Sequence, residues 1–435
     1  MNIKNSITLD NSLRVFYHYA RGILAWLYYK NPSKDMIVIG ITGTKGKSTT
    51  TNLVTKGLLD AGKKVFMFST INYCINGTFY ENNSKMTSPS PFLLNKLLAE
   101  AKKQGCEYAI IETSSHSIFY NRNYGINYDV VALTNIAQDH LDLHGNMENY
   151  VKTKLKLFEK LITYKRKEGI KKVTVINVDS PYSSGFLEQV SDVIYTYGLE
   201  KNAQIKAANI KYTKDFTTFE IKMPGNKMNI KTKLKGEFNV YNILATVAIL
   251  TSQRVSVESM EKTINSVEGI AGRLEEVPNN FGFNIFVDYA HTEDSLKSVL
   301  QTLRKMEGIK NIITIFGATG DRDKTKRPKM GKIADDFSDY IILTDDDTYT
   351  ENSLSIIKDV IPGIKRKEGD RFWIVPDRED AIRTGILMAG ENDVVLIAGK
   401  GAENIIVTNK GKFPWSDVGI ATKILHEIEN NKIQK

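Results

Sequence analysis

The chain has 435 residues, of which 41% are hydrophobic and 25% charged, and its formal net charge is +9. This composition is typical of a globular protein, excludes an intrinsically disordered chain, and gives enough length for two or three domains. Lysine and arginine are spread along the whole sequence, so we expect an anionic small substrate and no nucleic acid. Two cysteines without metal spacing, and no signal peptide or 18-residue apolar stretch, lead us to expect a cytoplasmic protein, which we take to be a monomer.

The first predicted element is the aromatic, amphipathic segment SLRVFYHYARGILAWLYYKNP at residues 12–32, which Arg14, His18 and Arg21 interrupt. We interpret it as a helix that packs on the first domain and ends at the turn before Pro32. A weak association of residues 12–29 with a membrane surface is the alternative, and the sequence leaves it open.

A glycine-rich segment, GTKGKST, lies between a predicted buried strand at residues 37–41 and a predicted helix at residues 52–59. Gly43 and Gly46 leave backbone N–H groups free to converge on an anion at a helix N-terminus. The segment therefore predicts a phosphate-binding loop.

Within this loop, Lys47 supplies a positive charge and Ser48 a hydroxyl ligand for Mg²⁺. The strict G-x-x-x-x-G-K-[ST] pattern is not met, because Ile41 stands five residues before Gly46. A chance turn of glycine, lysine and serine is the alternative.

Beyond this loop, strand-like and helical patterns alternate as far as residue 269, which predicts a mostly parallel α/β sheet covered on both faces. The strands are expected at residues 63–68, 108–113, 129–135 and 172–179, with a helix at 91–103 and an antiparallel hairpin within 217–236. A second α/β pattern begins near residue 272, with strands at 283–290, 311–320, 339–346, 371–377 and 393–401. We expect an N-terminal helical segment (1–35), an ATP-binding central domain (36–270) and a Rossmann-like C-terminal domain (271–435), with a cleft between the two α/β domains.

Polar motifs follow several of these strands, and ligands of open α/β sheets bind where strands end. Glu112 and His116 follow one strand, and another is followed by Asn135, Asp139, His140, Asp142 and His144. Carboxylate and imidazole groups near a phosphate loop suit Mg²⁺ or Mn²⁺, although each histidine taken alone is more often structural.

The second half of the chain carries further candidates. Asn239 and Asn242, three residues apart at the start of a helix, suit contacts to a base or ribose, although asparagine is also a common helix cap. Arg273 is a candidate phosphate clamp, and the loop GDRDKTKRPKMG, with Arg322, Asp323, Lys326 and Arg327, is interpreted as anion-binding. Another strand exit carries Gly399, Lys400 and Glu403.

Together these motifs resemble those of the Mur ligases. GTKGKST, TSP, ETSSHS, TNIAQDHLDLHG, ENYVKTKLKLF, GEFNVYN, GRLEEV, VDYAHT, GDRDKTKRPKMG and AGKGAE occur in the order expected of that family, over about residues 36 to 410. The resemblance is strongest to the branch that adds the third amino acid to UDP-N-acetylmuramoyl-dipeptide in peptidoglycan biosynthesis.

The resemblance implies an ATP-dependent amide ligase. The carboxylate of a muramoyl-peptide acceptor attacks the γ-phosphate of ATP and gives an acyl phosphate and ADP. The amine of an amino acid then attacks the acyl carbon, and phosphate leaves. Such a reaction depends on positioning, charge neutralisation and the exclusion of water.

The resemblance also assigns roles to residues. It places the nucleotide on Gly43, Thr44, Lys45, Gly46, Lys47, Ser48, Thr49, Asn239, Asn242, Arg273 and Asp288, with His291 in the same motif. Two Mg²⁺ ions are implied, with Ser48, Glu112, His140 and a carbamylated Lys154 as ligands, and Lys47, Glu112, His140 and Lys154 as the catalytic set. The Lys154 assignment depends on counting from Tyr150, because Lys152 and Lys156 are close by. Thr87, Ser88, Ser114 and Arg122 match acceptor-binding positions, and Arg322, Gly399 and Glu403 match the amino-acid site.

The sequence departs from the family pattern in two places. About 35 residues precede the first strand, where the family has a UDP-binding domain of about a hundred, so we expect that domain to be lacking and UDP recognition is open. The segment that reads D-N-P-R in diaminopimelate-adding enzymes contains Asp346 and Asp347 without the arginine, and Ala402 replaces the usual histidine. Two carboxylates there suit a basic amino acid, and solvated loop acids are the alternative.

Two other interpretations stay open. One is a ligase of the same superfamily that acts on a non-UDP acceptor, such as a polyamide or another cell-surface polymer. The other is a catalytically inactive scaffold, which the joint presence of Lys47, Glu112, His140 and Lys154 disfavours. A dinucleotide-binding oxidoreductase is disfavoured because no G-x-G-x-x-G follows a strand.

Overall fold

The computed structural model describes residues 6–82, 84, 86–213 and 215–433, which fall into two compact α/β units. Unit 1 contains the described residues up to 210 together with 218–231 and 238–266, and unit 2 contains 211–217, 232–237 and the chain from 267 onward. Two short segments of the predicted central domain, and its last residues from 267 to 270, thus belong to the second unit.

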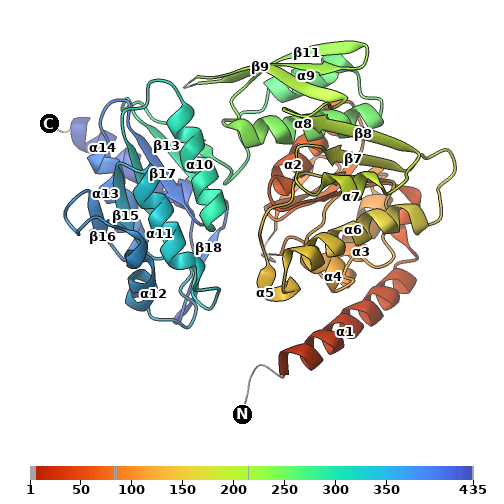
Figure 1. Cartoon of the computed structure of the whole chain (residues 1–435), viewed down its shortest axis with the longest axis horizontal. Coiled ribbons are helices and arrows are strands. Elements are labelled where there is room, and N and C mark those ends of the chain that lie inside the picture. The colour runs from red at the N-terminus through yellow and green to blue at the C-terminus, as the bar shows by residue number, and fades with distance from the viewer. Residues whose placement is uncertain (1–5, 83, 85, 214, 434–435) are drawn as a thin grey trace. The chain divides into compact units, whose positions relative to one another are not determined.

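Unit 1 is built on an eleven-stranded sheet (Figure 1). Its strand order is β11-β10-β9-β8-β7-β6-β1-β5-β2-β3-β4, and the strands from β9 to β2 pair in parallel. The strands are β1 (Ile37–Thr42), β2 (Val65–Phe68), β3 (Asn72–Ile75), β4 (Thr78–Glu81), β5 (Tyr108–Glu112), β6 (Val130–Leu133), β7 (Val173–Asn177), β8 (Val193–Gly198), β9 (Ile205–Tyr212), β10 (Thr217–Met223) and β11 (Asn226–Thr232).

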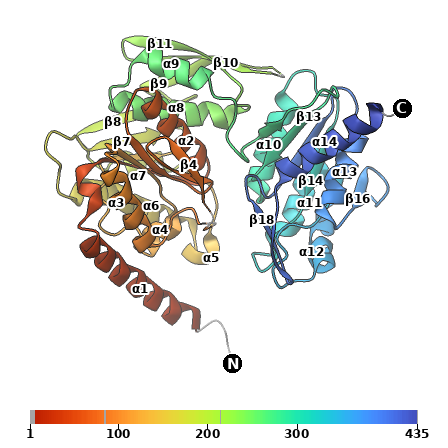
Figure 2. The same cartoon turned by 180° about the vertical axis from the view of Figure 1, so that it is seen from behind.

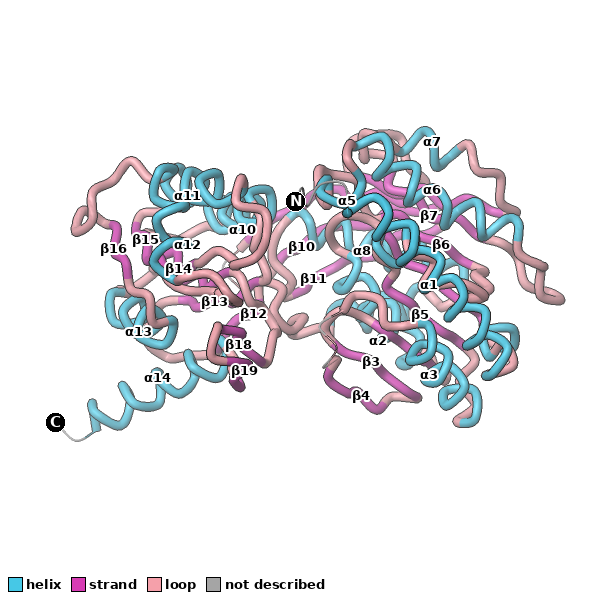
Figure 3. The backbone as a smooth tube through the Cα atoms, turned by 90° about the horizontal axis from the view of Figure 1, so that it is seen from below, coloured by secondary structure: helices cyan, strands magenta, loops and turns pink. Residues whose placement is uncertain are grey.

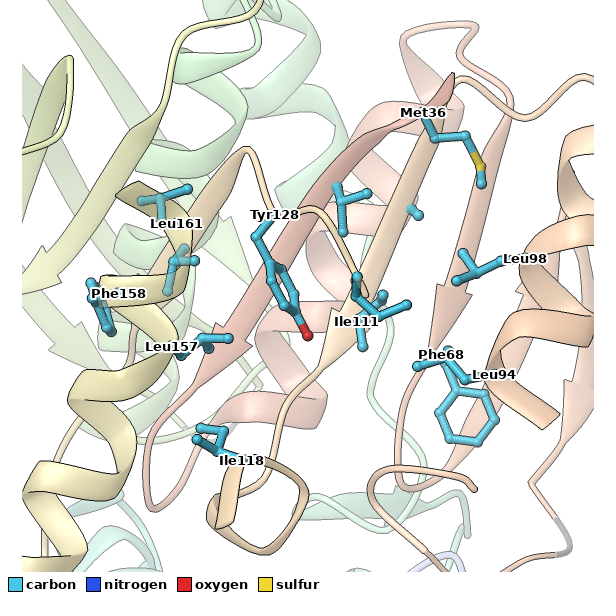
Figure 4. Close-up of a cluster of buried hydrophobic side chains, with 14 of the residues drawn as sticks. Met36, Phe68, Leu94, Leu98, Ile111, Ile118, Tyr128, Leu157, Phe158 and Leu161 are labelled. Atoms are coloured by element: carbon cyan, nitrogen blue, oxygen red, sulfur yellow. The ribbon is translucent and has the colours of Figure 1, made fainter. Parts of the chain in front are cut away.

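Helices cover both faces of this sheet. Successive residues of a strand, which point to opposite faces, are therefore both buried. On β1, Val38 belongs to the hydrophobic cluster of Figure 4, whereas the neighbouring Ile39 points to the opposite face and is equally buried. The helices of unit 1 are α1 (Ser6–Tyr28), η1 (Pro32–Asp35), α2 (Lys47–Asp60), α3 (Pro91–Lys103), α4 (Ser115–Phe119), α5 (Leu141–His144), α6 (Met147–Thr163), α7 (Ser183–Leu187), α8 (Glu237–Ser252) and α9 (Val257–Asn265). Apolar side chains of α3 and α6 complete the cluster, including Leu94, Leu98 and Leu157.

The helix α1 packs on unit 1 through its C-terminal half, while its N-terminal end extends away from the rest of the unit (Figures 1 and 2). Ala25 is fully buried, and the Tyr19 ring lies 4.9 Å from the Tyr124 ring. Several large apolar side chains of the helix are exposed, namely Leu13, Phe16, Tyr17, Leu24, Leu27 and Tyr28. Among the described residues, no helix has the length and apolarity needed to span a membrane.

Unit 2 contains a six-stranded sheet in the order β12-β13-β17-β14-β15-β16, parallel except for β12. The strands are β12 (Glu275–Val277), β13 (Asn284–Asp288), β14 (Ile312–Phe316), β15 (Tyr340–Leu343), β16 (Phe372–Ile374) and β17 (Val394–Ala398), with a separate hairpin of β18 (Ile405–Thr408) and β19 (Gly411–Pro414). The helices are α10 (Glu293–Lys305), α11 (Lys326–Phe337), α12 (Ser353–Val360), η2 (Ile361–Gly363), α13 (Arg378–Met388) and α14 (Asp417–Ile433).

The predicted α/β fold is confirmed, and so are the predicted buried strands and the helix at 91–103. The helix after the glycine-rich loop begins at Lys47, five residues earlier than predicted, because Gly46 adopts a left-handed conformation that caps it. The sequence did not reveal the β3–β4 hairpin at one edge of the large sheet (Figure 3). That hairpin is short and has little apolar alternation, which leaves no strand signal.

Candidate active site

The glycine-rich loop connects β1 to α2 in a conformation that two glycines make possible. Gly43 has a φ of +148°, and a Cβ there would lie 1.9 Å from Thr134 Oγ1. Gly46 has a φ of +81°, and a Cβ there would lie 2.1 Å from Asn242 Oδ1. Side chains at either position would therefore be strained and would also overlap a neighbour.

The loop is held in place by the residues that follow β6. The N–H of Thr44 donates to Asn135 O at 2.8 Å, and the N–H of Lys45 donates to Asn135 Oδ1 at 3.0 Å. Thr134 Oγ1 donates to Lys45 O at 2.6 Å. Asn135, predicted among the ligand-binding residues, thus positions the loop. Thr134 was not predicted, although its place directly after a buried strand was a usable signal.

Two lysines converge on one carbonyl of this loop. Lys47 Nζ donates to Gly43 O at 3.1 Å and to Thr44 O at 2.8 Å, and Lys154 Nζ donates to Gly43 O at 2.8 Å. Lys154 is 1% exposed and lies 4.7 Å from the centre of the Tyr150 ring. Burial, and then the positive charge of Lys47, lower the pKa of Lys154 well below its usual value, and Asp139 opposes this only in part.

Of the three closely spaced lysines on α6, Lys154 is the buried one. Lys152 and Lys156 are exposed, and Lys152 pairs with Glu148 on the same helix at 2.6 Å. Because α6 turns once every 3.6 residues, these neighbours point away from the loop.

A buried carboxylate, Glu112 at the end of β5, lies next to the loop. Ser48 Oγ donates to Glu112 Oε1 at 3.1 Å, the N–H of Thr70 donates to Glu112 Oε2 at 2.7 Å, and Thr70 Oγ1 donates to Glu112 Oε1 at 3.0 Å. Thr70 was not predicted as a site residue. It follows β2, a neighbour of β5 in the sheet, and that polar strand exit was the available signal.

The predicted acceptor-binding hydroxyls adjoin Glu112. The hydroxyls of Thr70 and Thr87 lie 2.9 Å apart, and Ser88 Oγ donates to Glu112 O at 3.3 Å. The hydroxyls of Ser88 and Ser114 lie 3.3 Å apart, and Ser114 caps α4. The fourth predicted residue, Arg122, is half-buried with its guanidinium 5.5 Å from the Tyr120 ring.

The histidines after β5 and β6 form an aromatic group. The His140 ring lies 4.5 Å from the His116 ring, and His140 Nε2 lies 3.5 Å from Asp139 Oδ2. His144 is buried and packs 5.2 Å from the Tyr150 ring, as a structural histidine does. Among the described residues, no three histidine, cysteine or acidic side chains are placed to hold a metal ion by themselves.

The two asparagines of α8 lie inside the helix and not at its cap. Both are buried, and Asn242 Nδ2 donates to Asn239 Oδ1 at 3.0 Å. The alternative interpretation as helix caps is therefore wrong for this pair. Asn242 instead lies against Gly46 of the phosphate loop.

In unit 2, the predicted nucleotide residues form a compact group at the exit of β13. The guanidinium of Arg273 lies 4.8 Å from the Tyr289 ring, and the two oxygens of Asp288 accept from Leu274 N at 2.7 Å and Ala290 N at 2.8 Å. His291 Nδ1 lies 2.8 Å from Tyr289 O. Asp288 thus fixes the backbone on either side of this loop and positions Arg273.

A buried lysine organises the predicted amino-acid site. Lys400 Nζ donates to Asp347 Oδ1 at 2.8 Å and to Glu403 Oε2 at 2.9 Å, and lies 3.8 Å from Asp346 Oδ1. Burial alone lowers the pKa of Lys400, but Asp346, Glu403 and Asp347 outweigh it and raise that pKa above its usual value. Both aspartates are 4% exposed, so the alternative of solvated loop acids is wrong.

The loop with Arg322 and Arg327 serves two purposes. Arg322 is exposed and its guanidinium lies 5.3 Å from the Tyr349 ring. Arg327 is fully buried and bonded to Glu351 and Asp359, so its predicted role in anion binding is corrected to a structural one. Gly399 has a φ of +119°, and a Cβ there would lie 2.7 Å from Asp346 Oδ2.

Comparisons with known proteins account for both units. Residues 41–250 match the family model of the Mur ligase middle domain, and residues 272–401 match the model described as "Mur ligase, glutamate ligase domain". The UDP-N-acetylmuramoyl-L-alanyl-D-glutamate–2,6-diaminopimelate ligase of Syntrophomonas wolfei is 36% identical over 406 residues, which are 93% of this chain and 81% of that protein.

Two further relatives agree. The protein of the same name from Halalkalibacterium halodurans is 38% identical over 87% of this chain and 76% of its own length. A solved structure of a diaminopimelate ligase of this name matches with a TM-score of 0.65 at 28% identity, covering 91% of this chain and 79% of that one. These similarities, found over both units and their strand-end motifs, establish that the chain belongs to the Mur ligase family.

Proposed function

We propose that this chain joins a carboxylate of a muramoyl-peptide acceptor to the amine of an amino acid, at the expense of ATP. An oxygen of the acceptor carboxylate bonds to the γ-phosphorus of ATP, and ADP leaves. The amine then bonds to the acyl carbon, phosphate leaves with the former carboxylate oxygen, and the amine loses a proton. The relatives named above are ligases for such an acceptor and for 2,6-diaminopimelate.

The observation that carries the proposal is the pair of lysines on the phosphate loop. Lys47 and Lys154 both donate to Gly43 O, so two amino groups meet beside the loop N–H groups that would receive phosphate. The lowered pKa of Lys154 favours its neutral amine, which is the form that reacts with CO₂. Formation of the N–C bond with release of a proton would turn this neutral amine into a carbamate, whose negative charge would attract the Lys47 ammonium.

The donors at the loop fit Mg²⁺, which prefers oxygen ligands. The buried Glu112 carboxylate and the Ser48 hydroxyl are bonded to each other beside the loop and would hold one ion together with phosphate oxygens. A carbamate on Lys154 would supply a carboxylate for a second ion, with His140 as a further ligand. The ions would neutralise the phosphate charge that develops during transfer.

The cluster around Lys400 supports a basic amino acid as the second substrate. Asp346, Asp347 and Glu403 surround a single ammonium group, so the cluster keeps a net negative charge. A cationic side chain would balance that charge, whereas a purely anionic one would add to it. Arg322 and Gly399 complete the group of residues that we assign to this substrate.

The test is ADP release with Mg²⁺, ATP and one amino acid at a time, with UDP-N-acetylmuramoyl-dipeptide or the same acceptor without UDP. We expect turnover that requires an acceptor and is faster with a basic amino acid such as lysine or ornithine than with diaminopimelate. Turnover with the UDP-free acceptor but not with the UDP-linked acceptor would show that the true acceptor does not carry UDP. If no ADP is released with either acceptor and any amino acid, the ligase proposal is contradicted and a non-catalytic scaffold is favoured.

Carbamylation of Lys154 has its own test. Enzyme prepared and assayed in CO₂-depleted buffer should lose most of its activity and regain it when bicarbonate is added. Lys154→Met should be inactive and unresponsive to bicarbonate, while the exposed Lys152→Met serves as the matched control. Equal activity with and without CO₂ would exclude the modification.

A further inference from the structure

The helix α1 brings a histidine to the ring that Arg122 also faces. The His18 ring lies 5.7 Å from the Tyr120 ring, and the guanidinium of Arg122 lies 5.5 Å from the same ring. The two basic side chains are 104 positions apart in the sequence and come from α1 and from the loop after α4. Tyr120 thus places them beside each other in the folded chain.

Neither side chain has a hydrogen-bond partner within the described residues. His18 Nδ1 and Arg122 Nε are both buried and unpaired. Buried polar atoms are nearly always paired, so an unpaired one calls for a missing partner. The terminal nitrogens of the same two side chains are neither buried nor bonded in the part of the chain that the structure describes, which leaves them accessible to a ligand.

The charges around this pair are of one sign. After burial, the groups that lower the pKa of His18 are Arg122, Arg21 and Arg14, all of them cations. Burial also lowers the pKa of Arg122, and Tyr120 opposes this effect. A surrounding made of cations, in the described part of the chain, is complementary to an anion.

The pair is also close to one of the acceptor serines along the chain. Ser114 caps α4, its hydroxyl meets that of Ser88, and the chain leaves α4 at Tyr120 and reaches Arg122 two residues later. A helix of only five residues therefore separates the acceptor serines from the basic pair. An acceptor that contacts both would present an anionic group in addition to its reacting carboxylate.

We propose that α1 forms one wall of the acceptor site, where His18 and Arg122 together bind an anionic group of the acceptor, either a carboxylate or a phosphate. This inference rests on the proposed ligase function and extends it to a segment that the family comparison leaves outside the matched residues 41–250. His18 is a positioning residue here, because it would contact the acceptor at a point remote from the reacting atoms.

The test compares His18→Gln and His18→Arg with the wild-type protein. The KM for the acceptor should rise about tenfold in His18→Gln, with kcat and the KM values for ATP and the amino acid unchanged, because a charged hydrogen bond is lost. His18→Arg should stay within about twofold of the wild type, since arginine is always charged and His18 takes up a proton when an anion binds beside it. His426→Gln, an exposed histidine of α14, is the matched control and should change nothing.

Two acceptors identify the anionic group. If His18→Gln raises the KM only for the UDP-linked acceptor, the anionic group is the diphosphate. If it also raises the KM for the UDP-free muramoyl-dipeptide, the group is a carboxylate. Equal acceptor KM values in His18→Gln and the control overturn the proposal. Calorimetric measurement of UDP-N-acetylmuramoyl-dipeptide binding separates the two proposals. If His18→Gln weakens binding but the wild type shows no turnover, only the ligase is refuted. If His18→Gln leaves the affinity unchanged, the anion site is refuted.

Discussion

At the scale of single residues, the phosphate loop depends on glycine for two separate reasons. Gly43 and Gly46 need backbone angles that other residues adopt at a cost, and each is also in close contact with a side chain. Thr134 and Asn242 occupy the space that a Cβ would need. The loop is therefore fixed by its neighbours on β6 and α8 as much as by its own sequence.

Gly46→Ala should destabilise the protein by about 3 kcal/mol and abolish binding of ATP analogues, because backbone strain and overlap with Asn242 add together. Gly62→Ala is the matched control, since Gly62 has a φ of +75° but nothing within 4 Å of the added Cβ. It should cost about 1 kcal/mol, from strain alone. Urea unfolding measures the free energy of unfolding of both variants, and equal losses of stability would contradict the role given to Asn242.

Lys400→Met should destabilise the protein by about 3–5 kcal/mol, because it leaves three carboxylates without the cation that they share. Lys412→Met, at an exposed position on β19, is the control. A loss below about 1 kcal/mol at neutral pH would contradict the buried network.

At the scale of elements, α1 is attached to unit 1 by close packing over a small residue. A Cβ on Gly22 would lie 2.7 Å from Tyr124 Cβ, and Gly125 lies against Trp26 in the same way. The helix has no room to shift toward the unit. The apolar side chains on the outward face of the helix take no part in this contact and are exposed.

Gly22→Val should displace α1, because the added side chain overlaps Tyr124 and overpacking costs about 1–3 kcal/mol. We expect faster tryptic cleavage after Arg14 and Arg21 in the native protein. Ala20→Val, at a position of intermediate exposure on the same helix, is the control and should leave the cleavage rate unchanged. Unchanged cleavage of Gly22→Val would contradict the packing described here.

The contact between α11 and the segment that precedes α12 predicts a pH dependence. The hydrogen bonds from Arg327 lower the pKa of Glu351 to about 2, against an opposing effect of burial and with help from Lys324 and the N–H of Asp321. A carboxyl whose folded pKa is lowered stabilises the protein above its usual pKa of 4.5, and this contribution is lost as the pH falls toward 2.

Glu351→Gln should therefore be less stable than the wild type at pH 6, and the difference should shrink between pH 4.5 and 2. Glu429→Gln, on α14, controls for the removal of one negative charge. Chemical unfolding at a series of pH values measures the difference. A difference that is constant over that range would contradict the ion pair with Arg327.

At the scale of the whole molecule, the residues that we assign to the nucleotide are divided between the two units. Lys47, Asn239 and Asn242 belong to unit 1, whereas Arg273 and Asp288 belong to unit 2. Each group is ordered by its own unit: the first by Thr134 and Asn135, the second by backbone bonds to Asp288. If both groups bind one nucleotide, ligand binding must act on both units at once.

Hydrogen exchange tests this expectation. Saturating Mg²⁺ and a non-hydrolysable ATP analogue should slow exchange at residues 43–50 of unit 1 and also at residues 272–290 of unit 2, because bound ligand stabilises what it contacts. Lys47→Ala should remove both effects. Protection confined to unit 1 would show that Arg273 and Asp288 do not contact the nucleotide.

The sequence by itself determined the α/β class, the glycine-rich turn between β1 and α2, the buried strands and the polar residues that follow them. These features are local: hydrophobic runs, glycines at fixed spacing and the order of motifs along the chain. It was also sufficient for the resemblance to the Mur ligases, which the comparisons bear out.

Only the tertiary structure decided which of these residues meet. It brought Lys154 to the same carbonyl as Lys47, joined Thr70 to Glu112, and placed Lys400 among Asp346, Asp347 and Glu403. It also gave Arg327 a structural role and put His18 beside Arg122. Such pairings depend on burial and on contacts between distant segments, and a linear pattern records neither.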